Sequence, residues 1–293
     1  MKPLFMWAGG KNKMLKKYAS HLPQSFDKYI EPFFGAGAMF VWAYQQNPAA
    51  TFIINDLNKD IVGIYKAIKN SPDPFIMKLD KLSAEYLPLV KEERKKYFYK
   101  LRNENAYDYE KWNETEQAAV LYFLMKTAFN GIWQINKNTN GRFGTPSGLL
   151  NQKDKVYDKS NVLEWHEALQ KCTILNDDFV VVKPMINDKT FLFMDPPYRG
   201  SFTQYGVDFN DGEQRRVIQL LNHCRKVNGY GLLSNRDIED GFFENETGGM
   251  EIIRFDVTYT AGRRKKTEAG FEAKRAKEVL ITTNKWKNKR KER

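Results

Sequence analysis

The chain has few of the residues on which metal centres, disulfide scaffolds and thiol catalysis depend. Its 293 residues include two cysteines and three histidines. Cys172 and Cys224 show neither metal-ligand spacing nor a disulfide framework, so we expect small buried apolar residues in a reducing compartment rather than catalytic thiols. The scattered histidines, at positions 21, 166 and 223, argue against a zinc site or a His-based triad. We therefore expect chemistry without a metal or a covalent nucleophile.

Long hydrophobic runs are also missing. No apolar run approaches the roughly 18 residues that a membrane helix needs, and the N-terminus lacks a secretory pattern. We accordingly expect no membrane partner. A hydrophobic content of 42% is nevertheless enough to bury a sizeable core, which indicates one domain with a subdomain.

Positive charge is concentrated in the last part of the chain. Residues 262–293 hold 13 lysines and arginines against 4 glutamates, which is +9 of the formal +11. Such a concentration indicates a polyphosphate partner, although the run 285–291 is equally typical of a solubilising, frayed tail. The tetrad Arg263-Arg264-Lys265-Lys266 lies between two expected strands, about 252–260 and 278–283. We expect it to reach phosphates from a long hairpin loop.

The most informative segment is Asp195-Pro196-Pro197-Tyr198, which directly follows the apolar run 191–194. It predicts a buried strand that stops abruptly, because the prolines exclude a helix. Asp195 and the Pro196 carbonyl offer two hydrogen-bond acceptors, and Tyr198 offers a flat apolar ring. This combination suits an exocyclic amine on a heterocyclic base, while an ordinary proline turn stays open as the alternative.

A second motif lies far upstream. The segment 29–38, with Gly35 and Gly37, is typical of a strand that opens through a Gly-x-Gly turn into a helix. The next expected strand, 51–55, ends at Asp56, 21 positions after Gly35. An acid at about this spacing can accept from ribose hydroxyls. Since the third glycine of the dinucleotide form is missing, the pattern favours a nucleoside ligand without a pyrophosphate.

The remaining pattern predicts strands and helices alternating at both ends, with a helical insert between them. An amphipathic helix is expected from about 59 to 69, stopped by the segment 71–74. Segment 92–103 favours a solvated helix with an aromatic core stripe over a basic DNA-binding face. A further helix is expected to begin near 115–117 and to include the apolar run 118–129. Residues 130–148 then predict a hairpin tipped with amide side chains.

Together these motifs resemble a DNA adenine-N6 methyltransferase of the Dam type, or D12 class. The order and spacing of the matching segments make the resemblance specific. They are Trp7-Ala8-Gly9-Gly10-Lys11, Glu31-Pro32-Phe33-Phe34-Gly35-Ala36-Gly37, Asn55-Asp56-Leu57-Asn58, Phe129-Asn130-Gly131, Asp195-Pro196-Pro197-Tyr198 and Leu233-Ser234-Asn235.

The resemblance implies an α/β fold: a Rossmann-like, S-adenosylmethionine-dependent methyltransferase sheet with an inserted, mainly helical target-recognition domain that carries a hairpin. Residues 1–70 and 171–293 would form the catalytic domain, and residues 71–170 the target-recognition domain. The cofactor would be S-adenosylmethionine, with no metal, and the partner double-stranded DNA. We further expect a monomer in the cytoplasm or on the nucleoid, in a bacterial or viral setting.

The same resemblance assigns the site residues. The expected catalytic residues are Asp195, Pro196, Pro197 and Tyr198. The expected cofactor-binding residues are Trp7, Gly10, Lys11, Glu31, Phe33, Gly35, Gly37, Asp56, Phe179 and Asp195. The expected DNA-binding residues are Asn130, Ile132, Gln134, Asn136, Arg142, Pro146, Arg263, Arg264 and Lys265.

Three other functions fit parts of the pattern. Cytosine-N4 methylation uses similar geometry, but the resemblance across residues 7–11 and at Asn130 favours adenine. Protein-glutamine and RNA amine methyltransferases commonly have Asn in place of Asp195. A DNA-binding homologue without activity is disfavoured by the intact acids and glycine turn.

The target sequence is less defined. In Dam-type enzymes that read GATC, an arginine after the Asn-Gly pair contacts a guanine, and Gln134 stands at that place here. Arg suits guanine O6 and N7, whereas Gln suits adenine N6 and N7. A later Phe-Gly-Arg stretch of that family reads Ser147-Gly148-Leu149, so Arg142 or Lys137 would have to supply a second basic group. The expected site is therefore GATC or a related short sequence.

Overall fold

The computed structural model of the chain describes residues 1–6, 14–131, 133–148, 155–200, 209–259, 265–267, 270–272 and 274–283. Within these ranges no helix is long and apolar enough to cross a membrane. The described residues also contain no group of three or more His, Cys, Asp or Glu side chains that could hold a metal ion.

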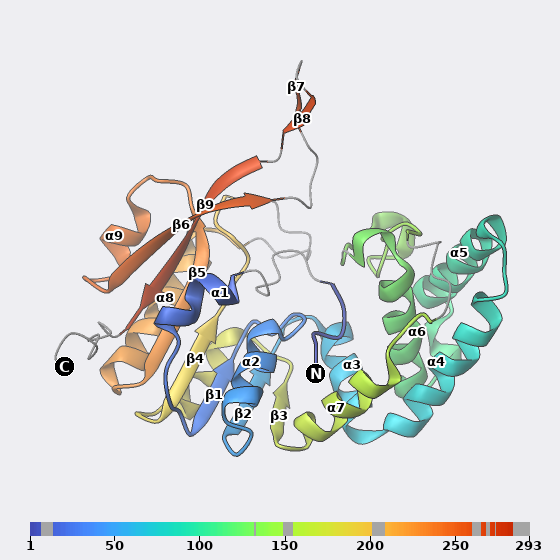
Figure 1. The fold of residues 1–293 in the computed structure, drawn as a ribbon, viewed down its shortest axis with the longest axis horizontal. Helices are drawn as coiled ribbons and strands as arrows, with labels where there is room; N and C mark the ends of the chain where they lie inside the picture. Colours follow the sequence, from blue (N-terminus) through green and yellow to red (C-terminus); the bar gives the residue numbers. More distant parts are fainter. Residues whose placement is uncertain are drawn as a thin grey trace.

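A seven-stranded sheet forms the centre of the molecule (Figure 1). Its strands are β1 (Lys28–Glu31), β2 (Thr51–Asn55), β3 (Cys172–Leu175), β4 (Thr190–Met194), β5 (Tyr230–Asp237), β6 (Glu251–Tyr259) and β9 (Lys274–Thr282), in the order β3-β2-β1-β4-β5-β9-β6. The first five are parallel, and β9 is antiparallel to both β5 and β6. The direction of winding reverses between β1 and β4, as in doubly wound nucleotide-binding sheets. The predicted Rossmann-like α/β class is confirmed.

Successive apolar side chains of a strand point to opposite faces of the sheet, so an apolar core forms on each face. In β4, Phe191 and Phe193 join the larger apolar cluster, whereas Leu192 and Met194 join the smaller one on the other side. All five β4 side chains are buried. Because successive side chains point to opposite faces, a strand covered on both sides reads as a continuous apolar run. That is why β2 was predicted with its observed bounds and β4 from its apolar run 191–194.

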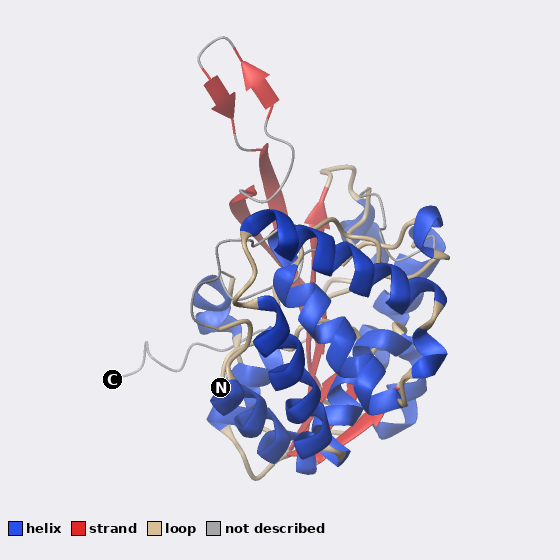
Figure 2. Ribbon diagram, turned by 90° about the vertical axis from the view of Figure 1, so that its right-hand side faces the viewer, coloured by secondary structure: helices blue, strands red, loops and turns tan. Residues whose placement is uncertain are grey.

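Helices cover both faces and extend beyond the β3 edge (Figures 1 and 2). The α-helices are α1 (Leu15–Tyr18), α2 (Ala38–Gln46), α3 (Lys59–Asn70), α4 (Pro72–Tyr86), α5 (Lys91–Tyr107), α6 (Glu114–Thr127), α7 (Lys159–Gln170), α8 (Asp211–Lys226) and α9 (Phe242–Glu246). Short 3-10 turns are η2 (Ala19–His21), η3 (Tyr109–Lys111), η4 (Phe129–Gly131), η5 (Lys137–Thr139) and η6 (Phe179–Met185). Side chains of α8 and α9 fill the smaller cluster, and those of α1 to α7 fill the larger one.

Helices α3, α4 and α6 begin at residues that favour a helix start. Asn58 accepts hydrogen bonds from the first turn of α3, and Pro72 opens α4 at a position where its missing N–H costs nothing. Asn113 and Glu116 form a reciprocal capping box at α6. Helix α6 therefore begins at Glu114, slightly before the predicted start, and ends at Thr127 rather than at residue 129. It ends there because Ala128 is extended and Asn130 is left-handed.

The segment predicted to form a hairpin is a loop closed by two isolated antiparallel bridges. Ala128 pairs with Ser147, and Ile135 pairs with Phe143. Trp133 packs against Phe143, with ring centroids 5.4 Å apart. The loop also contains η5, so its described residues form a bridged loop without continuous strands.

Strands β6 and β9 of this sheet form a long antiparallel pair, which confirms the two predicted strands beside the basic segment, although β9 begins at Lys274 rather than near residue 278. Residues 251–282 are called the arm below. A two-stranded sheet of β7 (Lys265–Thr267) and β8 (Gly270–Glu272) lies at its outer end (Figure 1). This small sheet was not predicted. Lys265 begins β7, whereas Arg263 and Arg264 lie outside the described residues.

Both cysteines are buried, as predicted, and their location among apolar residues raises the pKa of each thiol to about 12. A thiol with such a pKa stays protonated at neutral pH and is a poor nucleophile.

Candidate active site

Three acidic side chains lie at the carboxyl edge of the parallel sheet. Glu31 ends β1, Asp56 follows β2 and Asp195 follows β4. Ligands of open α/β sheets bind at this edge, beside the point where the strand order reverses. Here that point is between β1 and β4. The topology thus brings together three predicted site residues that are far apart in sequence.

The glycine turn after β1 has a left-handed backbone at both glycines. Gly35 has φ 49° and Gly37 has φ 67°. A Cβ atom at Gly37 would lie 2.8 Å from ring carbons of both Phe34 and Trp165. Glycine is therefore required at position 37 by the turn and by packing. The Gly35 N–H donates to Asp56, so the turn orients that acid.

Asp56 is held by the backbone on both carboxylate oxygens. Gly35 N donates to Oδ2 at 2.8 Å, and Asn58 N donates to Oδ1 at 2.9 Å. Asn176 Nδ2 donates to the backbone carbonyl of Asp56 at 2.8 Å and joins it to the end of β3. Since a carboxylate has about four lone-pair sites, two remain for ligand hydroxyls. Burial raises the pKa of Asp56, and the two backbone bonds counteract part of that rise.

Glu31 is fully enclosed beside the other two acids. Its Oε2 accepts a 2.7 Å hydrogen bond from the Tyr29 hydroxyl. Burial raises the pKa of Glu31 well above its usual range, and the negative charges of Asp195 and Asp56 raise it further. Asp195 and Asp56 are therefore close enough to disfavour the ionisation of Glu31, and such a cluster favours a cationic ligand.

Aromatic rings lie next to the glycine turn. Phe33 contacts Phe179 with ring centroids 5.0 Å apart and meets Phe209 edge-on at 6.0 Å. Phe179 begins η6 behind Asp178, whose side chain accepts from Val180 N at 2.9 Å. A planar ring of a ligand could continue this aromatic group. The expected cofactor residues Trp7, Gly10 and Lys11 lie outside the described residues.

The Asp195–Tyr198 segment is fixed from behind by two buried amides. Gln214 of α8 donates to the Pro197 carbonyl at 2.9 Å, and Asn235 of β5 donates to Gln214 Oε1 at 2.9 Å. Gln214 is 1% exposed and Asn235 is 0% exposed. The Pro196 carbonyl, by contrast, receives no hydrogen bond from any described residue. It is available to accept from a bound group.

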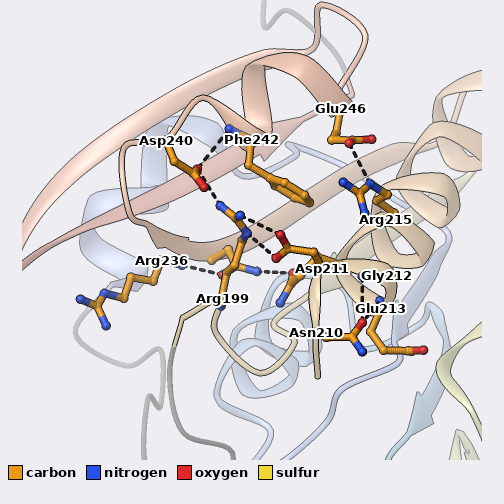
Figure 3. A network of polar contacts seen from close by, with 12 residues as sticks. Arg199, Asn210, Asp211, Gly212, Glu213, Arg215, Arg236, Asp240, Phe242 and Glu246 are labelled. Carbon is orange, nitrogen blue, oxygen red and sulfur yellow. Dashed lines mark hydrogen bonds and ion pairs between the residues drawn. The ribbon is translucent and has the colours of Figure 1, made fainter. Parts of the chain in front are cut away.

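Arg199, the next residue, anchors the end of the segment (Figure 3). Its guanidinium binds Asp211 bidentately at 2.7 and 2.9 Å and Asp240 at 2.6 Å. It also lies 4.0 Å from the centre of the Phe242 ring. The two aspartates raise the pKa of Arg199, and Arg199 lowers theirs. One arginine thus ties the segment to α8 and to the loop before α9.

Five of the expected DNA-contacting residues lie on the bridged loop after α6: Asn130, Gln134, Asn136, Arg142 and Pro146. Asn130 has φ 53° and Gly131 has φ 57°, so the Asn-Gly pair turns the chain sharply out of the helix. A Cβ at Gly131 would lie 2.9 Å from Met6 Cβ. The turn therefore packs closely under residue 6, directly before the expected cofactor segment.

Most predicted members of this loop are solvent-exposed. Gln134, Asn136 and Pro146 are exposed, while Gln134 O accepts from Gly144 N at 2.7 Å. Arg142 instead donates to the Asn105 carbonyl at 3.1 Å and lies 3.6 Å from the Tyr109 ring centre. Part of its guanidinium is thus used within the protein, to hold the loop on α5. Ile132 lies outside the described residues.

Sequence reasoning missed several residues around these sites. Phe129 is 54% exposed although it is a large apolar residue beside Asn130. Gln214 and Glu278 contact the Asp195–Tyr198 segment and Arg199 directly follows it, but none of the three was singled out. Arg199 could have been found from its adjacency to Tyr198. Gln214 and Glu278 had no local signal, because only the fold brings α8 and β9 to the segment.

Comparisons with known proteins agree with this geometry. A family model of D12 class N6 adenine-specific DNA methyltransferases matches residues 7–260. Type II methyltransferase M.MjaIII of Methanocaldococcus jannaschii is 34% identical over 246 residues, which cover 80% of this chain and 84% of the relative. M.CviBI of Paramecium bursaria Chlorella virus NC1A is 30% identical, over 84% and 89% of the two chains. M1.LlaDCHI of Lactococcus lactis subsp. cremoris is 25% identical, over 92% and 94%. The chain therefore belongs to the D12 class of N6 adenine-specific DNA methyltransferases.

Proposed function

We propose that this protein transfers the methyl group of S-adenosylmethionine to N6 of an adenine that it flips out of duplex DNA. The proposal rests most on the difference in hydrogen bonding between the carbonyls of Pro196 and Pro197. The Pro197 carbonyl is occupied by Gln214, while no described residue donates to the Pro196 carbonyl next to Asp195. Two neighbouring acceptors at a fixed strand end fit the two hydrogens of an exocyclic amine.

The residues at the sheet edge fit the expected cofactor. Two lone-pair sites of Asp56 remain for ribose hydroxyls, and the aromatic group of Phe33 and Phe179 suits an adenine ring. The convergence of Glu31, Asp56 and Asp195 suits a ligand with an ammonium and a sulfonium charge. When bound there, S-adenosylmethionine supplies an electrophilic methyl group. Trp7, Gly10, Lys11, Gly35 and Gly37 complete the proposed cofactor set.

The protein's own groups would act on the target amine. The N6 lone pair of adenine is delocalised into the ring, so the free amine is a weak nucleophile. Asp195 and the Pro196 carbonyl, accepting both N–H hydrogens, would favour a pyramidal nitrogen and stabilise the positive charge that develops on it. In-line positioning of nitrogen and methyl carbon supplies a further part of the acceleration. Asp195 need not be a strong base, because a methylated amine loses its proton readily.

A base inside a duplex cannot reach this strand end, so flipping is required. Tyr198 would stack on the extruded adenine. An exposed aromatic residue such as Phe129 suits insertion between bases near the vacated position. We further propose that residues 71–170 form the target-recognition domain and that residues 1–70 and 171–293 form the catalytic domain.

Recognition would be divided between two elements. Gln134 on the bridged loop would read a base edge within GATC or a related short site, with Asn130, Asn136 and Pro146 nearby. Arg263, Arg264 and Lys265 on the arm would meet phosphates, which position the protein without reading sequence.

Mass spectrometry of nucleosides from cells that express the protein tests this proposal. N6-methyladenine should appear in DNA from expressing cells and be absent from cells that express Asp195→Ala. Sequencing of the methylated positions then defines the site. N4-methylcytosine, or DNA without modification, would contradict the proposal.

A further inference from the structure

A buried glutamate on the antiparallel strand β9 lies directly behind the catalytic tyrosine. Glu278 is 3% exposed, and it pairs in register with Arg236 of β5 and with Phe255 of β6. Its Oε1 accepts from the Tyr198 hydroxyl at 3.0 Å. Its Oε2 accepts from the Tyr18 hydroxyl of α1 at 3.3 Å. One carboxylate therefore joins the end of the Asp195–Tyr198 segment to the N-terminal helix.

The donors around this carboxylate can be assigned from chemistry. The Tyr18 hydroxyl also lies 2.9 Å from Ser234 Oγ. Both tyrosine hydroxyls donate to the carboxylate oxygens of Glu278. Ser234 then donates to the Tyr18 oxygen. Each hydroxyl has one consistent direction, and the chain runs from Ser234 through Tyr18 and Glu278 to Tyr198.

This arrangement is not what packing alone would select. A buried carboxylate is costly unless it is paired and hydrogen-bonded, and well-packed apolar residues are often as stabilising. A phenylalanine at position 198 could also stack on a base without any hydroxyl. A hydrogen bond at the far end of the ring, however, holds the ring in one orientation.

We propose that Glu278 is a positioning residue that fixes the ring of Tyr198 for the target adenine. This inference rests on the proposed function, because it takes Tyr198 to be the ring on which the flipped base stacks. Through Tyr18, the same carboxylate binds α1, the helix that follows the expected cofactor segment 7–11.

The test uses the full-length protein and a duplex with its methylated site, identified as above. In one duplex 2-aminopurine replaces the target adenine, so that its emission reports stacking on the flipped base. The variants are Tyr198→Phe, Glu278→Gln, the double variant and Tyr18→Phe. Tyr18→Phe is the matched control, because it removes one hydroxyl from the same carboxylate without altering the catalytic segment. Emission, KM for DNA, kcat and the urea midpoint are measured for each.

Tyr198→Phe and Glu278→Gln should each raise 2-aminopurine emission and raise KM for DNA about 5- to 10-fold, as expected for the loss of one hydrogen bond. The double variant should be no worse than either single variant, since both remove one interaction. Tyr18→Phe should lower the urea midpoint but keep wild-type emission and KM.

Wild-type KM and emission in Glu278→Gln would overturn the inference. The inference would also be overturned if the shift of the urea midpoint in the double variant equalled the sum of the shifts in Tyr198→Phe and Glu278→Gln, because the two groups would then not interact. A Tyr18→Phe variant with the same emission and KM as Glu278→Gln would also overturn it, since the effect would be general damage. Failure of the proposed function shows separately, as duplex DNA left unmethylated by the wild-type protein.

Discussion

Gln214 Nε2 lies 2.9 Å from the carbonyl oxygen of Pro197, and this contact leaves the Pro196 carbonyl as the one that receives no hydrogen bond from a described residue. The amide is itself fixed, because Asn235 donates to its oxygen at 2.9 Å. Asn235 Oδ1 in turn accepts from the backbone N–H of Arg199 at 3.0 Å. Helix α8 and strand β5 thus hold the segment on both sides of Tyr198.

Asp195→Ala should leave methyl transfer near background, because the substitution removes one acceptor of the target amine and one carboxylate of the cofactor site. The measurement is turnover on duplex DNA under saturating cofactor, with unfolding monitored to confirm an intact fold. Retention of more than about a tenth of wild-type turnover, a difference of roughly 1.4 kcal/mol, would contradict the role.

Asp56→Ala should raise the dissociation constant for S-adenosylmethionine by the equivalent of about 1.5–3 kcal/mol, the value of a hydrogen bond to a charged group. Binding of DNA without cofactor should be nearly unchanged. Isothermal titration measures both. Asp60→Ala is a suitable control, because Asp60 lies in the first turn of α3, close to Asp56 in sequence. Unchanged cofactor affinity in Asp56→Ala would contradict the proposal that Asp56 binds the ribose hydroxyls.

Glu31→Gln should stabilise the cofactor-free protein at neutral pH and weaken cofactor binding. The folded-state pKa of Glu31 is raised by burial and by Asp195 and Asp56. An acid with a raised folded pKa contributes stability below its unfolded pKa, and that contribution is lost as the pH rises through the folded pKa. Glutamine removes this loss and can still accept from Tyr29.

Thermal unfolding of wild type and Glu31→Gln across the pH range checks this prediction. The variant should have the higher midpoint at neutral pH, and the two curves should approach each other as the pH falls. A variant that is less stable at neutral pH would show that ionised Glu31 is compensated in the free protein.

Arg199→Lys should reduce kcat/KM and lower the free energy of unfolding by about 1–2 kcal/mol, because lysine cannot bind Asp211 bidentately while stacking on Phe242. The expected loss in the free energy of unfolding is modest because both aspartates are partly exposed. Arg215→Lys is the matched control, since Arg215 also lies over the Phe242 ring, at 5.5 Å, and pairs with Glu246. Its half-exposed pair should contribute less than about 1 kcal/mol. Equal losses of kcat/KM and of stability in both variants would show that Arg199 is no more important than Arg215 for holding the Asp195–Tyr198 segment.

Gln134→Ala should relax preference at one base pair by about 1–3 kcal/mol, with little change in salt dependence. Arg264→Ala should weaken binding to all sequences alike and lower the log–log salt slope by about one. Competition binding at several salt concentrations separates the two effects. A reversed outcome, with Arg264 altering preference and Gln134 altering the slope, would exchange the roles of loop and arm.

Much of this protein could be predicted because its strongest signals are local. The apolar strands β2 and β4 have a composition that fits burial on both faces, and Asp56 and Asp195 directly follow them. Parallel strands share one carboxyl edge, so the sequence alone determined that these two acids would lie at a common site. Amide-rich composition predicted a hairpin over residues 130–148, whereas the structure has a loop with two isolated bridges there.

Tertiary structure decided what depends on contacts between distant segments. Gln214 and Glu278 have no local pattern that indicates a role, and each reaches the Asp195–Tyr198 segment only because α8 and β9 pack beside β5. The sequence predicted that Arg142 contacts DNA, but in the structure its guanidinium binds the Asn105 carbonyl and lies over the Tyr109 ring. The pKa of Glu31 is raised by burial and by two acids from other strands. Side-chain burial and long-range electrostatics depend on three-dimensional neighbours, so the residues that position the catalytic groups became visible only in the folded chain.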